Sequence, residues 1–482
     1  MKIINIFLSL LVFPFIGLAQ DYPNDFLSAE FHKSRREELR KILPSNSVAV
    51  FFSNPVRNRA NDVEYIYHQD PDLYYLTGYR EPHAVLLIFK EMQTTAQGEK
   101  YNEIFFVQPR NPDAEMWTGR RMGSGGVKDI LKIQQVFDNS EFTRYGIDFS
   151  SFNKVLFYDF HNDVRDTNNQ SDLFDLIAHF KKKVNYPGSS SSNFTIEPAP
   201  ANLDTQTLEK LMNNLRGIKL PQEIDLIKKA VDISAIGQVE VMKAMRPGLS
   251  EREIQGIHEF VYKKYGSEYE GYPSIVGAGH NGCILHYIDN YKPEINNKEL
   301  ILMDLGAEYH GYTADVTRTI PVSGKFSPEQ KLIYDLVYKA QEQAIQAAKP
   351  GVTFGQLTRI TRIIVMEGLA ELGIIKNASQ PNMYYPHGCC HHIGLDVHDR
   401  GNYDVLEENM VITVEPGIYI PEGSNCDEKW WGIAVRIEDD ILITKDGFIL
   451  LSNKAPRKSD EVEKMMALPS PLDNFVLPDL NK

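Results

Sequence analysis

The sequence has few cysteines, no surplus of positive charge and no long hydrophobic run beyond its first residues. Only four cysteines occur in 482 residues, which excludes a small scaffold framed by disulfides. Lysine and arginine total 51 against 65 acidic residues, a formal net charge of −14, so no basic face is available to neutralise nucleic-acid phosphates. After residue 18 no segment is apolar enough to span a bilayer. We therefore expect no nucleic-acid partner.

The N-terminal segment has the order of a secretory signal peptide. Met1 and Lys2 give a positive start, residues 3–18 are apolar, and the small residues of the GLA sequence at 17–19 lie where cleavage needs them. We expect residues 1–19 to be removed and the mature protein to be secreted or periplasmic, without a stable membrane span. An uncleaved membrane anchor is the alternative, because the apolar run approaches spanning length.

The length of the chain predicts two domains, and a hydrophobic content of 42% is enough to fill both cores. Helical stretches alternate with short apolar runs in the first part, which indicates an α/β domain. A Pro-Gly pair, four successive serines and a Pro-Ala-Pro sequence then indicate a linker. The predicted parts are a first domain over residues 24–185, a linker over 186–203, a second domain over 204–467 and a C-terminal tail over 468–482.

The second half contains a weak internal repeat. A helical pattern over residues 222–245 leads through Pro-Gly to Ser250, and another over residues 329–348 leads through Pro-Gly to Thr353. In each case glycine closes the first helix and a hydroxyl side chain caps the next. Apolar strands follow each helix pair. The pattern predicts an α+β domain of two related halves with a cleft between them.

Two acids lie in a predicted β-hairpin. The apolar strand ELILMDLG contains Asp304, and the β-rich return strand contains Asp315. A hairpin centred between residues 309 and 310 places the two carboxylates opposite one another, where like charges destabilise a sheet unless a cation neutralises them. The alternative is that one acid faces solvent and the other pairs with Arg318, because a register slip of one residue turns a side chain to the other face.

Two further apolar strands carry carboxylates. Residues 411–415 (VITVE) end at Glu415, and residues 432–438 (GIAVRIE) place Arg436 and Glu438 on one face through the two-residue period of a strand. Buried carboxylates are rare unless they are paired or bound to a metal. One arginine can pair with only one of the four acids, so the others need a cation.

Histidines cluster in residues 387–399 (HGCCHHIGLDVHD), which hold four of the 13 histidines of the chain. One of them is a candidate metal ligand, and the others are candidate proton carriers or substrate contacts. An oxygen-rich set with a single imidazole favours Mn²⁺, although Zn²⁺, Co²⁺ or Fe²⁺ would also bind. Four carboxylates and one histidine suit two ions about 3.5–4 Å apart that are bridged by carboxylates and a hydroxide. The expected chemistry is hydrolysis, in which the hydroxide attacks a carbonyl and a neighbouring acid or base moves the proton.

These segments resemble the aminopeptidase P and prolidase group of metallopeptidases with the pita-bread fold, which also includes methionine aminopeptidases and creatinase. The resemblance spans about residues 26–466 and implies an N-terminal creatinase/aminopeptidase P-like α/β domain followed by a C-terminal pita-bread α+β domain. Five stretches carry it in the catalytic half: residues 275–287 (IVGAGHNGCILHY), 301–319 (ILMDLGAEYHGYTADVTRT), 387–399 (HGCCHHIGLDVHD), 413–419 (TVEPGIY) and 432–444 (GIAVRIEDDILIT).

The resemblance implies roles for particular residues. Asp315 and Glu438 would bridge two divalent ions, and Glu415 would also shuttle the proton of the attacking water. The five implied metal ligands are Asp304, Asp315, His391, Glu415 and Glu438. The implied catalytic residues are Glu415, His398, His286 and Arg436. The implied substrate-binding residues are His387, His286 and Trp117.

First-domain motifs favour the aminopeptidase P branch over prolidase. The sequences YYLTG at 74–78 and WTGRR at 117–121 look like the first domain of aminopeptidase P, in which a tryptophan reaches the cleft of a neighbouring subunit. The expected activity is removal of the N-terminal residue of peptides with proline second, by a homo-oligomer. A prolidase that cleaves dipeptides, and a peptide-binding protein without turnover, are the alternatives.

The adjacent Cys389 and Cys390 depart from the family pattern, in which other small residues are usual. Adjacent cysteines are poorly placed to form a disulfide with each other. We expect the cysteines to be buried thiols near the site, where oxidation or adventitious metal binding would affect activity.

Overall fold

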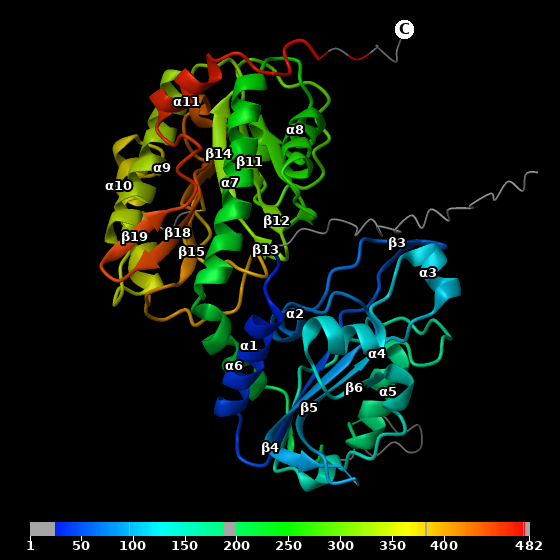
Figure 1. The fold of residues 1–482 in the computed structure, drawn as a ribbon. Helices are drawn as coiled ribbons and strands as arrows, with labels where there is room; N and C mark the ends of the chain where they lie inside the picture. Colours follow the sequence, from blue (N-terminus) through cyan, green and yellow to red (C-terminus); the bar gives the residue numbers. More distant parts are fainter. Residues whose placement is uncertain (1–24, 96, 188–198, 381–382, 476, 478–482) are drawn as a thin grey trace, which may run out of the picture.

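The computed structural model describes residues 25–95, 97–187, 199–380, 383–475 and 477. The chain forms a smaller N-terminal domain, at the bottom of Figure 1, and a larger C-terminal domain above it. The predicted signal peptide at 1–19 lies outside the described residues, as do most of the predicted linker and the end of the tail. Within the described residues, no helix has the length and apolar character needed to cross a membrane.

The first domain is built on a six-stranded sheet with the order β6-β5-β4-β1-β7-β8. Its central strand β1 is a continuous apolar run because both faces are covered: Ala49 and Phe51 enter the core shared with the second domain, whereas Val48 and Val50 enter a separate core. The strands are β1 (Ser47–Phe52), β4 (Val85–Thr94), β5 (Lys100–Val107), β6 (Val136–Asp138), β7 (Lys154–Leu156) and β8 (Leu203–Asp204). The helices are α1 (Ala29–Ile42), α2 (Pro71–Thr77), α3 (Pro112–Thr118), α4 (Gly123–Gly126) and α5 (Leu173–Lys183). A small hairpin of β2 (Asn58–Ala60) and β3 (Val63–Glu64) stands apart from the sheet.

The edge of this sheet lies beyond the predicted domain boundary. Leu203, the last residue of the predicted linker, pairs with Val155 in strand β7. Residues 188–198 of that linker lie outside the described residues. The chain therefore returns to the first sheet before it enters helix α6 (Thr207–Gly217) and the second domain.

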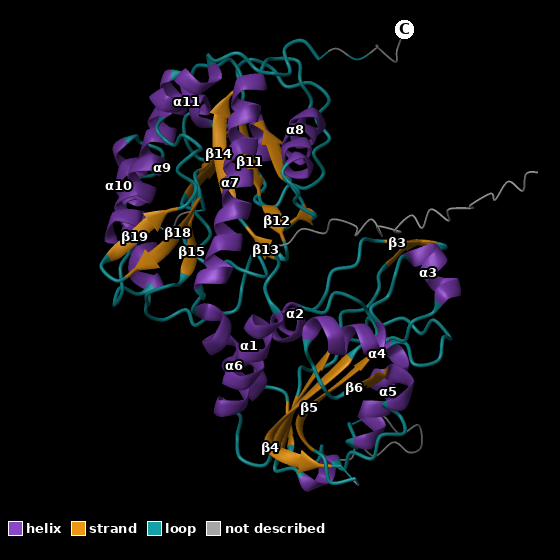
Figure 2. Cartoon of the chain, in the orientation of Figure 1, coloured by secondary structure: helices purple, strands orange, loops and turns teal. Residues whose placement is uncertain are grey.

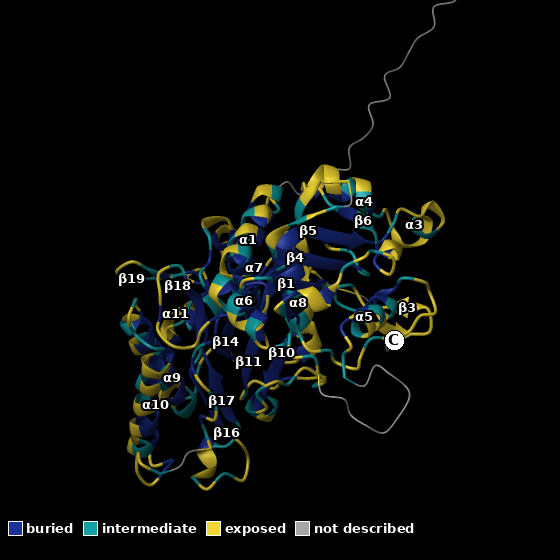
Figure 3. Ribbon diagram, turned by 90° about the horizontal axis from the view of Figure 1, so that it is seen from below, coloured by how far each residue is buried: buried dark blue, intermediate teal, exposed yellow. Residues whose placement is uncertain are grey.

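The second domain places helices outside and strands inside, as Figures 1 and 2 show. Figure 3 shows these inner strands mostly in the dark blue of buried residues. The helices are α7 (Pro221–Ala244), α8 (Glu251–Lys264), α9 (Pro328–Ala347), α10 (Phe354–Glu371) and α11 (Ser459–Met466). One sheet contains β10 (Ile275–Ala278), β11 (Leu300–Leu305) and β14 (Val316–Pro321). A second contains β15 (Val411–Val414), β18 (Asp439–Thr444) and β19 (Gly447–Leu450), and a third pairs β16 (Gly417–Ile420) with β17 (Ile433–Arg436). A short sheet joins β9 (Tyr269–Glu270), β12 (Ala307–Tyr309) and β13 (Tyr312–Thr313).

The internal repeat predicted from the sequence is present. Helices α7 and α9 begin and end within one residue of the predicted spans, and α8 packs on α7 as α10 packs on α9. Ser250 caps α8 and Thr353 caps α10, each in a reciprocal capping box. Gly248 (φ +92°) and Gly351 (φ +90°) make the turns that precede these caps.

Each repeat also fixes its strands with a buried glutamine. Gln238 of α7 donates to the carbonyls of Met303 and Val316, at 3.1 and 2.7 Å. Gln341 of α9 donates to the carbonyl of Val414 at 3.0 Å. The two helices thereby hold the strands of each half in place.

The hairpin of the first half has a register different from the predicted one. Tyr309 pairs with Tyr312 and Asp304 pairs with Thr317, so the hairpin is centred between residues 310 and 311. His310 (φ +52°) and Gly311 (φ +86°) form a two-residue turn in which both residues have positive φ, and this geometry fixes the register. The predicted direct opposition of Asp304 and Asp315 was wrong. The shift preserves the two-residue period, so both acids still lie on one face.

A buried histidine on helix α8 predicts a pH dependence of stability. Burial lowers the pKa of His258 from 6.5 to about 4, and its ring packs against Gly237 and Tyr262. Because the unfolded chain binds this proton more readily, stability is full above pH 6.5 and falls as the pH drops toward 4. His258 should therefore contribute about 2 kcal/mol to the loss of unfolding free energy between pH 7 and pH 5.

Urea unfolding of the metal-free chain at pH 7 and pH 5 measures this contribution. The variant His258→Leu removes the titrating group and should lose less stability between the two pH values than the wild type. An equal loss in both proteins would contradict the assignment, because the remaining dependence would then come from other groups.

Candidate active site

The five predicted metal ligands come together at the ends of strands. Asp304 is in β11 and Asp315 lies just before β14, whereas Glu415 follows β15 directly. Glu438 lies between β17 and β18, and His391 comes from the segment that precedes β15. All five line one cavity of about 500 Å³. The structure thus brings together residues that are more than 130 positions apart in the sequence.

The donor atoms of this cluster are close enough to share metal ions. The Nε2 atom of His391 lies 3.5 Å from an oxygen of Asp315, 3.7 Å from one of Glu415 and 3.8 Å from one of Glu438. The ligand atoms of Asp315, His391 and Glu438 all lie within 4.8 Å of one another. Asp304 adjoins them through Tyr272, whose hydroxyl is 2.6 Å from Asp304 and 2.5 Å from Asp315.

The charges of the cluster are unbalanced without a cation. Burial and the neighbouring charges of Asp304 and Asp440 raise the pKa of Asp315 well above its ordinary value. Burial and Glu438 likewise raise the pKa of Glu415. Burial and Asp315 raise that of Glu438. Asp315 and Glu438 are buried and Glu415 is partly exposed. Three such carboxylates that suppress one another's ionisation are the donor set that a divalent cation stabilises.

Arg436 neutralises only one member of the cluster. Burial opposes ionisation of Asp304, but the guanidinium of Arg436, 2.5 Å away, brings the pKa of this carboxyl below its ordinary value. Arg318, the other arginine that the sequence offered as a partner, instead binds Asp439 at 2.7 Å. The alternative of a simple arginine pair with Asp315 is therefore excluded.

Neighbouring groups orient the ligands. The Nδ1 atom of His391 lies 3.0 Å from the carbonyl oxygen of His392, a contact that makes Nδ1 the donor and leaves the Nε2 lone pair toward the carboxylates. Thr317 donates to Glu438 at 2.6 Å. The backbone amide of Asp315 donates to Asp440 at 3.0 Å.

Three further histidines line the same cavity: His286, His387 and His398. The ring of His398 stands edge-on to that of His391, with the centroids 4.5 Å apart. Burial, followed by the charge of Arg436, lowers the pKa of His387 to about 4, so this ring is neutral. Within the cluster at 387–399, His392 is different: it is buried beside Phe354 and Tyr403 and serves the core.

A series of hydrogen bonds connects Arg436 to His387 on the cavity wall. Arg436 donates to the hydroxyl oxygen of Tyr419 at 2.8 Å. That hydroxyl lies 2.8 Å from Nε2 of His387, whose Nδ1 is 2.6 Å from the carbonyl of Gly388. These hydrogen bonds fix the positions of Arg436, Tyr419 and His387 relative to one another along the cavity.

Trp117 is not part of this cavity. It lies on helix α3 of the first domain, and the residue is 87% exposed. Within one chain, the structure does not bring the predicted substrate-binding tryptophan to the metal ligands.

Two tyrosines at the site were not singled out from the sequence. Tyr419 belongs to the TVEPGIY stretch and lies two residues after Gly417, which pairs with Arg436. The two-residue period of a strand could therefore have indicated that Tyr419 and Arg436 share a face. Tyr272 lies in an irregular segment between β9 and β10, where no periodic pattern reports its direction. Only the fold places its hydroxyl between Asp304 and Asp315.

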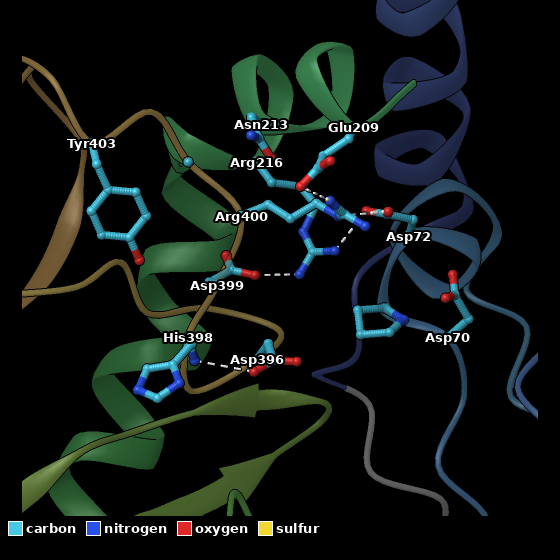
Figure 4. A pocket seen from close by; sticks show the side chains of 12 residues that line it. Asp70, Asp72, Glu209, Asn213, Arg216, Asp396, His398, Asp399, Arg400 and Tyr403 are labelled. Atoms are coloured by element: carbon cyan, nitrogen blue, oxygen red, sulfur yellow. Dashed lines mark hydrogen bonds and ion pairs between the residues drawn. The ribbon is translucent and has the colours of Figure 1, made fainter. Parts of the chain in front are cut away.

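A buried ionic network supports the segment that carries His398. Asp399, the next residue, accepts hydrogen bonds from Arg216 of α6 and from Lys219. Arg216 also donates to Asp72 of α2 at 2.6 Å. Figure 4 shows Arg216 between these two carboxylates, beside a cavity of about 450 Å³ that His398 also lines. The network links the first domain to the edge of the active site.

Known families match both halves of the chain. The model described as metallopeptidase family M24 matches residues 225–445, and the model described as aminopeptidase P, N-terminal domain, matches residues 32–155. The Xaa-Pro aminopeptidase of Escherichia coli is 34% identical over 91% of this chain and 98% of that protein. The Xaa-Pro aminopeptidase of Haemophilus influenzae is 36% identical over 91% of this chain and 97% of its own.

A solved structure has the same fold. The structure of aminopeptidase P from E. coli with the inhibitor Pro-Leu superposes with a TM-score of 0.79 at 32% identity, over 92% of this chain and 98% of that one. The similarity extends through both domains, as the sequence motifs predicted.

Proposed function

Because the chain belongs to metallopeptidase family M24, with the N-terminal domain of aminopeptidase P ahead of the catalytic domain, we propose that it is an Xaa-Pro aminopeptidase. Such an enzyme removes the first residue of a peptide whose second residue is proline. The observation that carries the proposal is the convergence of donor atoms from Asp315, His391 and Glu438 within 4.8 Å, inside a cavity that also holds Asp304 and Glu415.

The cavity offers both polar and apolar walls to a peptide. Beside the metal ligands and histidines it is lined by Pro273, Ile275, Leu285, Ile288 and Val397. An apolar wall of this kind suits the pyrrolidine ring of proline, whereas the polar groups orient the scissile bond. This arrangement supports a preference for proline at the second position.

We propose two divalent ions, with Mn²⁺ as the native metal, because the donor set has four carboxylates and one imidazole. Asp304 would hold one ion and His391 with Glu415 the other, while Asp315 and Glu438 would bridge them. When bound, the ions would activate water for attack and polarise the carbonyl of the scissile bond.

The side chains around the ions would move the proton and stabilise charge. A carboxylate oxygen of Glu415, which lies 3.6 Å from Nδ1 of His387, would take the proton of the attacking water and give it to the proline nitrogen that leaves. His398 stands at the cavity wall beside His391, where its ring N–H would donate to the oxyanion. His286 and His387 would orient the substrate, and Arg436 would hold Asp304 and Tyr419 in place.

Release of the first residue from a tripeptide tests the function. The mature chain loaded with Mn²⁺ should cleave Ala-Pro-Leu with a kcat/KM about tenfold or more above that for Ala-Ala-Leu, because the apolar wall can contact more of a proline ring than of the smaller alanine side chain. Chromatography of the released alanine gives both rates. Cleavage of the dipeptide Ala-Pro alone would identify a prolidase, and absence of turnover with all peptides would favour a binding protein.

We further propose that the protein is exported and forms a homo-oligomer. The composition of residues 1–19 supports export, and N-terminal sequencing of the secreted chain should begin at Gln20.

The exposed Trp117 supports the proposed homo-oligomer, through a contact with the cleft of a second subunit. Light scattering of the purified protein tests this, and a monomeric enzyme with full activity would refute it.

A further inference from the structure

Two thiols lie side by side next to the proposed metal ligands. The Sγ atoms of Cys389 and Cys390 are 3.0 Å apart, and all four cysteines of the chain are free. Cys389 is completely buried and lies 3.6 Å from the hydroxyl of Thr358, whereas Cys390 is partly exposed. The pair is therefore reachable from one side only, through Cys390.

The backbone couples this pair to two metal ligands. The carbonyl of Cys389 accepts the backbone amide of Glu415 at 2.8 Å, and the residue after Cys390 is His391. The His391 carbonyl in turn accepts the amide of Thr413 at 2.9 Å.

Cys389 and Cys390 are poorly placed to form a disulfide with each other. Adjacent Cα atoms are about 3.8 Å apart, whereas disulfides usually join Cα atoms about 4.4–6.8 Å apart, so a bond within the pair is strained and easily reduced. Two neighbouring thiols instead offer two soft ligands to one atom. The oxygen donors of the adjacent cluster are hard and do not compete for such an atom.

We propose that Cys389 and Cys390 form a chelating dithiol site for soft thiophilic ions and metalloids, and that filling it inhibits the peptidase by displacing His391 and Glu415. With phenylarsine oxide as the probe, two arsenic–sulfur bonds form and the arsenic–oxygen double bond breaks. The two thiol protons leave with the oxygen as one water molecule, and nothing is oxidised or reduced. Because the second bond forms within one chain, the adduct should resist displacement by monothiols.

Mass spectrometry of the metal-free full-length chain tests binding independently of the peptidase activity. Wild type should carry one phenylarsenic group per chain, which an excess of 2,3-dimercaptopropanol removes and an equal thiol concentration of 2-mercaptoethanol does not. Cys389→Ala and Cys390→Ala should each lose the stable adduct. Cys283→Ala and Cys426→Ala, which remove single thiols elsewhere, should keep it. An adduct that survives in Cys390→Ala, or none in the wild type, would overturn the site.

Inhibition is measured with the Mn²⁺-loaded enzyme and the tripeptide. The probe should lower the rate of wild type about 10–100-fold, the usual cost of disturbing the groups that position metal ligands. The Cys389→Ala and Cys390→Ala variants should retain their rate in its presence. If the adduct forms and the rate of wild type is unchanged, the coupling to His391 and Glu415 is refuted. If no peptide is cleaved at all, the proposed function fails while the mass measurement still decides the dithiol site.

Discussion

Replacing Asp315 with alanine is expected to remove the bound metal and to slow tripeptide cleavage about a thousandfold or more. Asp315 is one of three residues whose ligand atoms lie within 4.8 Å of one another, so its loss takes a donor from the centre of the cluster. The metal ions contribute several kcal/mol of charge stabilisation to hydrolysis, and about 1.4 kcal/mol corresponds to a tenfold change in rate. Elemental analysis after dialysis and steady-state kinetics measure the two effects.

The variant Asp315→Asn separates loss of metal from loss of fold. It keeps the size of the side chain and its contact with Tyr272 but removes one of several mutually repelling charges. The metal-free Asp315→Asn chain should therefore be at least as stable as metal-free wild type in thermal unfolding. Added Mn²⁺ should stabilise the wild type and leave the variant unchanged, because only a protein that binds the ion gains stability from it.

An acid on the same hairpin provides the control. Glu308 lies on β12, and its carboxylate contacts His68 of the first domain at 2.9 Å instead of the metal cluster. Glu308→Gln should retain metal and activity. Hydrolysis at the wild-type rate by Asp315→Ala without bound metal would refute the metal-dependent mechanism. The same rate with the metal retained would refute Asp315 as a required ligand.

Replacing Arg216 with methionine is expected to lower the free energy of unfolding by about 3–5 kcal/mol, because it leaves buried carboxylates without their shared cation. Arg216 is 2% exposed and bridges Asp72 of the first domain and Asp399 beside His398. In the variant Lys219 still contacts Asp399 and Arg400 still contacts Asp72, so the loss should come from the buried Arg216 contacts that join the two domains. Chemical denaturation of wild type and variant in the same buffer measures the loss.

Arg400 supplies a matched comparison within the same network. It contacts Asp72 at 2.8 Å, but 27% of its side chain is exposed, so water compensates part of any loss. Arg400→Met should therefore destabilise the chain less than Arg216→Met. Equal effects of the two substitutions, or a loss below about 1 kcal/mol for Arg216→Met, would show that the network contributes no more than surface ion pairs do.

Much of the active site followed from local sequence patterns. Strand periodicity and the rarity of unpaired buried carboxylates identified Asp304, Asp315, Glu415 and Glu438 as candidate ligands, and the structure brings them into one cavity. The predicted spans of α7 and α9 agree with the structure to within one residue at each end, and the capping residues Ser250 and Thr353 placed the starts of α8 and α10. These features are local, because a helix cap or an alternating strand depends on residues only a few positions apart.

Partner choice did not follow from such patterns. Arg318 was a possible partner of Asp315, but the fold brings it to Asp439 instead. Adjacent histidines looked equivalent in the sequence, yet His391 faces the carboxylates whereas His392 faces Phe354. A long side chain takes the partner that tertiary packing brings within reach, and neighbouring residues on an extended segment point to opposite sides.

The sequence by itself indicated the two-domain α/β and α+β architecture and the internal repeat, because periodicity and capping are short-range. Strand periodicity and residue chemistry also made Asp304, Asp315, Glu415 and Glu438 candidate ligands, whereas the choice of His391 among the clustered histidines rested on the family resemblance. Tertiary structure alone decided the hairpin register, which the positive φ angles of His310 and Gly311 set one residue later than predicted. It alone placed the hydroxyl of Tyr272 between two acids and buried Arg216 between two domains. These arrangements join segments far apart in the chain, and no local pattern specifies the distance between them.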